Sequence, residues 1–139
     1  MVGGITYICE NATHLSMLQD ESIESLSALC SVEHFGLGRY GDPIEPDAWE
    51  KALKAFQRVL RPGGKLYFSV PIGKLDKCCF NAHRVYNPYT VINTLDKMRI
   101  VEFSFISGPC ETTMCIYCQA KFKNVPIRNV KMYHFHKFF

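Results

Sequence analysis

The spacing of apolar positions changes from one segment of the chain to the next. Residues 5–9, 22–32 and 65–72 are short apolar runs, each of which predicts a strand. Residues 47–60 instead repeat apolar side chains at helical spacing, and the stop signal Pro62-Gly63-Gly64 follows them. The third run is almost continuously apolar, which is typical of a central parallel strand covered on both faces.

The second half continues the alternation. Residues 74–86 predict a loop, and Asn87-Pro88 opens a short helix, because asparagine is a common cap and proline suits the first turn. Residues 99–107 and 114–122 predict two strands, which the turn signal Gly108-Pro109 joins as an antiparallel hairpin. The order of elements predicts an α/β fold, half of a doubly wound sheet.

Composition fits one packed domain and excludes several classes of protein. The chain has 139 residues, of which 47% are hydrophobic and 21% charged. A net charge of +3 is too small to indicate nucleic acid or an anionic membrane, and no apolar run reaches the roughly 20 residues of a membrane span. Seven irregularly spaced cysteines indicate reduced thiols and a cytoplasmic location. No metal is predicted, since Cys115 and Cys118 lie three apart on a strand and point to opposite faces.

The loop after the second strand carries the densest candidate chemistry. Glu33 and His34 stand at a strand end, where a histidine is suited to proton transfer near neutral pH. Arg39, Tyr40 and Asp42 follow among glycines and are predicted to bind a substrate. The alternative for these three is a structural loop held by an internal contact between Arg39 and Asp42.

A second candidate group follows the third strand. Asn81, His83 and Arg84 are predicted to face the same cleft, where they join His34 and Arg39 in a basic cluster suited to an anionic acceptor. The alternative is a surface loop of solvated polar side chains.

Three motifs carry a resemblance over roughly residues 5–122. The chain resembles the C-terminal part of class I S-adenosylmethionine-dependent methyltransferases, and more closely a bacterial family of uncharacterised methyltransferase-like proteins. Residues 123–139 fall outside the resemblance as a basic, aromatic tail. The motifs are Val32-Glu33-His34-Phe35-Gly36-Leu37-Gly38-Arg39-Tyr40-Gly41-Asp42-Pro43, Arg58-Val59-Leu60-Arg61-Pro62-Gly63-Gly64-Lys65-Leu66 and Phe80-Asn81-Ala82-His83-Arg84-Val85-Tyr86.

The resemblance implies a partial Rossmann-like methyltransferase sheet that ends in an antiparallel hairpin, and S-adenosylmethionine as cofactor. Glu10-Asn11-Ala12 aligns with a Gly-Asp-Ala turn of the family, so Asn11 and Ala12 are the implied cofactor-binding residues. The amide oxygen of Asn11 would accept the adenine amino hydrogen bond without charge. In the broad superfamily the pair at Glu33-His34 often only borders the cofactor site.

The resemblance also implies a missing first half. Family members begin with a strand, a glycine-rich turn, a helix and a second strand with an acidic residue, so we expect this chain to be truncated. The strand over 22–32 would then be an exposed edge that favours a homodimer, unless the strand over 5–9 pairs with it. We expect a reduced sheet of four or five strands.

Two functions follow from these observations. The first is methyl transfer from S-adenosylmethionine to a small acceptor, saccharide-like or anionic. The second is a non-catalytic remnant, or a binding or assembly module that lacks the cofactor cradle.

Overall fold

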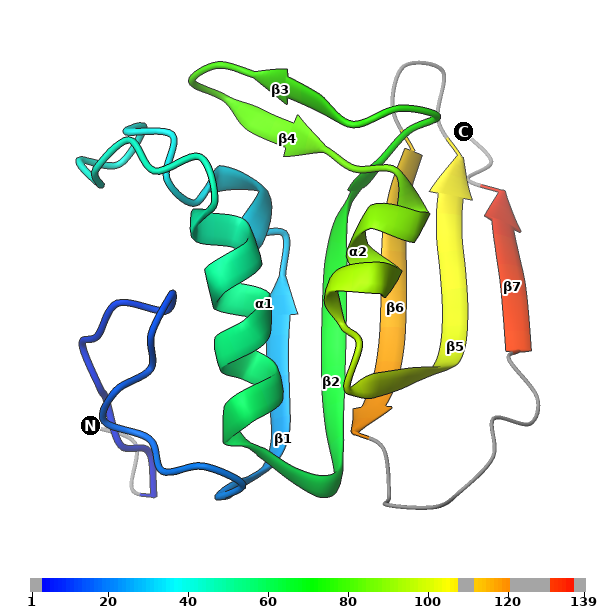
Figure 1. The fold of residues 1–139 in the computed structure, drawn as a ribbon. Coiled ribbons are helices and arrows are strands. Elements are labelled where there is room, and N and C mark those ends of the chain that lie inside the picture. The colour runs from blue at the N-terminus through cyan, green and yellow to red at the C-terminus, as the bar shows by residue number, and fades with distance from the viewer. Residues whose placement is uncertain (1–3, 108–111, 121–130, 137–139) are drawn as a thin grey trace.

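The computed structural model describes residues 4–107, 112–120 and 131–136, with side chains described as far as residue 104. These residues form a larger sheet, a small hairpin and two helices (Figure 1). A 3₁₀ turn, η1, follows the first strand. The elements in chain order are β1 (Ile23–Leu29), η1 (Val32–His34), α1 (Ala48–Val59), β2 (Leu60–Ile72), β3 (Lys77–Cys79), β4 (His83–Val85), α2 (Pro88–Thr94), β5 (Met98–Ser107), β6 (Thr112–Ala120) and β7 (Lys131–His136).

The larger sheet has the strand order β1-β2-β6-β5-β7. The strands β1 and β2 are parallel and are joined through α1, whereas β6 runs antiparallel to both of its neighbours. The predicted α/β fold is confirmed, and so is the final antiparallel pair, which is β5 with β6. Part of the segment predicted to be a tail joins the sheet, because β7 pairs in parallel with β5.

Both helices lie on one face of the sheet (Figure 1). The side chains of Leu66, Phe68 and Val70 alternate along β2 and are at most 1% exposed against this layer. Burial of one such side chain stabilises the fold by about 1.5–3 kcal/mol. On the other face Tyr67 is 42% and Leu29 60% exposed, so the prediction that both faces of this strand are covered is wrong. The reason is topological, because neither described helix crosses to that face.

The prediction of a strand over residues 5–9 is wrong. Ile5, Tyr7 and Ile8 are all more than half exposed, and none of the strands in the described part of the chain pairs with this segment. The five-stranded count is nevertheless right, because β7 supplies the fifth strand at the opposite edge. A consequence is that β1 stands at the sheet edge, as the sequence predicts.

The side chain of Arg58, in the last turn of α1, forms hydrogen bonds with the N-terminal segment. The guanidinium of Arg58 donates to the backbone oxygens of His14, Leu15 and Leu18 at 3.0, 2.8 and 3.1 Å. It also forms an ion pair with Asp20 at 2.5 Å. These contacts hold residues 14–20, which directly follow the turn over residues 10–13, beside the last turn of α1.

The segment from 74 to 86, predicted to be a loop, contains the short hairpin β3–β4. The predicted cap of α2 is confirmed, since the Asn87 side chain accepts a hydrogen bond from the backbone N–H of Tyr89 at 2.9 Å. The hairpin lies at the carboxyl ends of β1 and β2, on the same side of the sheet as the loop after β1 (Figure 1). This end of the sheet therefore gathers the predicted site segments that follow β1 and β2.

Candidate ligand-binding site

The glycine-rich loop after η1 is held by contacts within itself. Gly36 has φ +69°, and its carbonyl oxygen accepts from the N–H of Glu45 at 3.0 Å. The carboxylate of Asp42 accepts from the backbone N–H groups of Tyr40 at 3.1 Å and Gly38 at 3.3 Å. These backbone hydrogen bonds, the one from Tyr40 foremost, lower the pKa of Asp42, so the side chain is a carboxylate at neutral pH.

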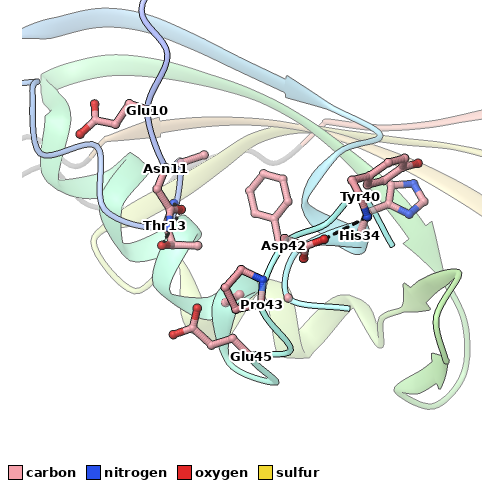
Figure 2. A pocket seen from close by; sticks show the side chains of 12 residues that line it. Glu10, Asn11, Thr13, His34, Tyr40, Asp42, Pro43 and Glu45 are labelled. Atoms are coloured by element: carbon pink, nitrogen blue, oxygen red, sulfur yellow. Dashed lines mark hydrogen bonds between the residues drawn. The ribbon is translucent and has the colours of Figure 1, made fainter. Parts of the chain in front are cut away.

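A pocket of about 310 Å³ lies between this loop and the N-terminal turn (Figure 2). The two segments are more than twenty residues apart in sequence and meet because Arg58 fixes the turn beside α1. Predicted residues from both segments share the lining. The pocket is lined by Glu10, Asn11, Ala12, Thr13, His34, Phe35, Gly36, Tyr40, Asp42, Pro43, Glu45 and Ala48.

The N-terminal turn is built by two acceptor side chains. The Oδ1 atom of Asn11 accepts from the backbone N–H of Thr13 at 2.9 Å and from its hydroxyl at 2.8 Å. Both lone pairs of that oxygen are therefore used. The group of Asn11 that remains for a ligand is its Nδ2 donor, whereas the sequence suggested that its amide oxygen would accept a hydrogen bond from the ligand. Glu10 accepts from the Ser16 hydroxyl and the Met17 N–H, and these bonds lower the pKa of Glu10.

Glu33 and His34 lie side by side at the wall of the pocket, and only His34 belongs to its lining. The Nδ1 atom of His34 lies 2.6 Å from the carbonyl oxygen of Ala82, and because a carbonyl only accepts, Nδ1 carries a proton. The other ring nitrogen, Nε2, lies 3.8 Å from Oε1 of Glu33. Glu33 is 3% exposed, its Oε2 has no hydrogen-bond partner among the described residues, and burial raises its pKa. Burial thus favours the neutral form of the Glu33 carboxyl group.

Two rings flank the imidazole of His34. The Tyr40 ring lies edge-on at 5.8 Å between centroids, and the His83 ring lies at 6.4 Å. The guanidinium of Arg39 lies 5.8 Å from the centre of the Tyr40 ring, outside the pocket lining. No ion pair joins Arg39 to Asp42 in the described structure, so the loop is held by backbone hydrogen bonds rather than by the contact that the sequence suggested.

Arg84 has a structural position. Its side chain is 7% exposed and donates to the backbone oxygens of Phe35 and Pro46, which ties β4 to the glycine-rich loop. It lines a second cavity, of about 350 Å³, with Trp49 and Tyr86. Asn81 is exposed and lines neither cavity. The predicted basic cluster is therefore only partly assembled: the two histidines are close, while the two arginines lie outside the first pocket.

Several residues that line the pocket were not predicted from the sequence. Glu10 and Thr13 flank the predicted Asn11-Ala12 and could have been found from that position. Glu45 and Ala48 carry no local signal in the sequence, because the folded loop brings them back to Gly36. The lining residues that were not predicted are Glu10, Thr13, Phe35, Gly36, Pro43, Glu45 and Ala48.

The side chains of Cys110, Cys115 and Cys118 lie outside the described residues, and no group of three metal-ligating side chains occurs among those that are described.

Solved structures with the same fold include two methyltransferases and one cyclase. One is a methyltransferase from Methanosarcina mazei, with a TM-score of 0.60, 15% identity, and 82% of this chain covering 66% of that one. Another is the 1,6-didemethyltoxoflavin-N1-methyltransferase of Burkholderia thailandensis, with a TM-score of 0.61, 13% identity, and 82% of this chain covering 49% of that one. The [4+2]-cyclase SpnF has a TM-score of 0.61 and 12% identity, with 84% of this chain covering 56% of that one.

The fold is thus the Rossmann-like α/β fold of class I methyltransferases, and the chain spans about half to two thirds of the length of these structures. A family model described as "Caenorhabditis protein of unknown function, DUF268" matches residues 8–116, and the chain belongs to this family. The closer resemblance to a bacterial family stays a prediction. No curated protein matches the chain. None of the helices in the described part is long and apolar enough to cross a membrane.

Proposed function

We propose that this chain is a methyltransferase-like domain that binds S-adenosylmethionine in the pocket between the N-terminal turn and the glycine-rich loop. The observation that carries the proposal is the convergence of Asn11 and Ala12 with His34 and Tyr40 on one cavity, at the carboxyl end of a methyltransferase-type sheet. Ligands of open α/β sheets bind at this end. The adenosine would lie against the turn, where the Nδ2 donor of Asn11 suits a ring nitrogen, and the acceptor would lie toward His34 and Tyr40.

In this proposal His34 takes a proton from the acceptor and Glu33 positions it. Methyl transfer needs the acceptor atom in line with the sulfonium methyl group, and a base only where the acceptor must lose a proton. The Ala82 carbonyl fixes the imidazole tautomer, which leaves Nε2 as the basic atom. The Glu33 carboxylate, 3.8 Å away, would stabilise the imidazolium that forms.

The remaining predicted residues fall into different roles. Tyr40 and Asp42 line the pocket and are proposed to contact the acceptor, with His83 behind His34. A saccharide-like acceptor fits the hydrogen-bonding groups there. An anionic acceptor loses its main support, since Arg39 and Arg84 do not line the pocket. We also propose a cytoplasmic location, on the grounds of the irregular cysteine pattern.

Calorimetric titration with S-adenosylhomocysteine tests the proposal. We expect saturable one-site binding by the purified chain, abolished by Ala12→Phe, which fills the pocket. Gln19→Phe adds the same ring to an exposed position outside the pocket and should bind as the native chain does. Absence of binding by a chain shown to be folded would refute the cofactor proposal and leave a non-catalytic module.

A further inference from the structure

The charged groups that line the pocket are of one sign. Among its twelve lining residues are three carboxylates, Glu10, Asp42 and Glu45, and neither lysine nor arginine (Figure 2). Hydrogen bonds lower the pKa of both Glu10 and Asp42, so both are ionised at neutral pH. Among the lining residues, His34 is the one whose side chain can carry a positive charge, and its Nε2 lies 3.8 Å from the Glu33 carboxyl group.

The neighbouring cations are paired with other groups as well as with lining carboxylates. Lys51 pairs with Glu45 but also with Asp47 at 3.2 Å, so these three groups keep a net negative charge. Arg58 is engaged by backbone oxygens and by Asp20, and Arg84 by two backbone oxygens. Arg58 also acts on Glu10 through space, but the lining carboxylates and their acidic neighbours outnumber these cations, so the pocket keeps a net negative charge.

Aromatic side chains complete the pocket. The rings of His34, Phe35 and Tyr40 belong to the lining. The Tyr40 side chain is 72% exposed, and the Arg39 guanidinium lies 5.8 Å from the centre of its ring. Aromatic faces attract ammonium groups by about 0.5–2 kcal/mol, and the attraction rises as water is excluded. A cavity with aromatic walls and a carboxylate rim disfavours anions and attracts organic cations.

We propose that the acceptor is a small organic amine that enters the pocket as its ammonium ion. This inference rests on the proposed function and names its substrate class. The ammonium first gives a proton to Nε2 of His34. The nitrogen lone pair then forms a bond to the methyl carbon of S-adenosylmethionine. The bond from sulfur to that carbon breaks, and its electron pair stays on sulfur as the neutral thioether. The products are a methylated ammonium, S-adenosylhomocysteine and protonated His34.

A matched set of probes tests the charge preference without cofactor. Benzylamine, benzyl alcohol and benzoate share one ring and differ in charge, and binding of each is followed by calorimetry at low salt. We expect benzylamine to bind at least about tenfold more tightly than benzyl alcohol, with a preference that weakens as salt is added, and benzoate to bind weakest. Equal binding of the three, or tighter binding of benzoate, overturns the inference.

Isosteric variants test whether the preference for benzylamine arises in this pocket. Glu10→Gln keeps the acceptor oxygen for Ser16 and Met17 but removes the charge, and should weaken benzylamine about fivefold or more without changing benzyl alcohol. Glu24→Gln removes a carboxylate that pairs with Arg61 on the surface and should change neither. If the two variants weaken benzylamine equally, the attraction is a property of the whole molecule and the inference fails.

The two proposals fail separately. Binding of S-adenosylhomocysteine without any preference for benzylamine overturns the amine acceptor and leaves the cofactor proposal standing. A preference for benzylamine in a chain that does not bind S-adenosylhomocysteine supports the cation pocket and overturns the proposed methyltransferase.

Discussion

At the scale of single residues, Gly36 shows how the pocket depends on backbone conformation. A Cβ atom added there would lie 2.0 Å from the Glu45 carbonyl oxygen and 2.7 Å from Cβ of Ala48. Gly41 also has positive φ, +81°, but a Cβ there would meet nothing within 4 Å. The two glycines therefore separate the cost of conformation from the cost of contact.

We predict that Gly36→Ala lowers the free energy of unfolding by at least about 3 kcal/mol, because backbone strain and overpacking add. Gly41→Ala should cost about 1 kcal/mol, from the left-handed conformation alone. Denaturant unfolding of both variants measures the difference. Equal losses would show that the loop moves away from the added methyl group, and that Gly36 does not fix the pocket wall.

The buried carboxyl group of Glu33 predicts a dependence of stability on pH. Burial raises its pKa above the usual 4.5, so above pH 4.5 the unfolded chain releases this proton before the folded chain does. The contribution of Glu33 to stability is therefore lost as the pH rises. Glu33→Gln removes the titration, so the stability of the native chain relative to this variant should fall between pH 4.5 and 7.

Denaturant midpoints of both chains over that pH range give the difference, and titrations common to both cancel. A native chain that gains stability relative to Glu33→Gln would mean that pairing with His34 outweighs burial.

At the scale of elements, the spacing of apolar residues predicted those helices and strands whose formation depends mainly on their own sequence. The helix predicted over 47–60 is found as α1, because its apolar positions recur at helical spacing. The apolar run over 22–32 contains β1, although the strand ends at Leu29 and Val32 already belongs to η1. The run over 5–9 is equally apolar, yet it is not a strand, because a strand needs a partner and sequence does not show whether one is present. The same limit applies to β7, whose pairing with β5 depends on an available edge.

The candidate site was predictable to a similar extent. Residues near a strand end, such as His34 and Asp42, could be placed at the pocket from order alone. The direction of a long side chain could not, and Arg84 turns inward to two backbone oxygens instead of facing a ligand. Glu45 reaches the pocket through a hydrogen bond between distant backbone groups, which leaves no mark on local sequence.

The connection between the N-terminal segment and α1 gives a prediction at this scale. Arg58→Met keeps much of the side-chain volume but removes the donors for His14, Leu15 and Leu18. We expect a loss of about 1–3 kcal/mol in the free energy of unfolding, together with faster amide hydrogen exchange over residues 10–21. Arg61→Met removes a surface pair with Glu24 and should cost less than about 1 kcal/mol without changing that exchange.

Unchanged exchange in the Arg58 variant would contradict this account, since the N-terminal turn would then be held by other contacts. Loss of the turn should also remove one wall of the pocket. Binding of S-adenosylhomocysteine is therefore expected to weaken in Arg58→Met and to persist in Arg61→Met.

At the scale of the whole molecule, the unpaired edge of β1 is the main feature that the described fold leaves open. This strand has seven residues and contains no lysine, proline or glycine, the residues that commonly protect an edge. Its sequence is compatible with antiparallel pairing to a second copy about Leu26. Ile23 would then face Leu29 of the second copy, Glu24 would face Ala28, and no two like charges would meet.

We propose that the chain forms a homodimer through this edge, and predict that Ser27→Lys shifts it toward monomer. Ser27 is exposed on β1, and a lysine there carries charge into the paired edge. Light scattering during gel filtration over a range of concentrations measures the mass, and Gln19→Lys, an exposed change of the same charge outside β1, should leave the dimer intact. A native chain that is monomeric throughout would contradict the proposal, and so would a dimer that Ser27→Lys does not weaken, since pairing would then use another surface.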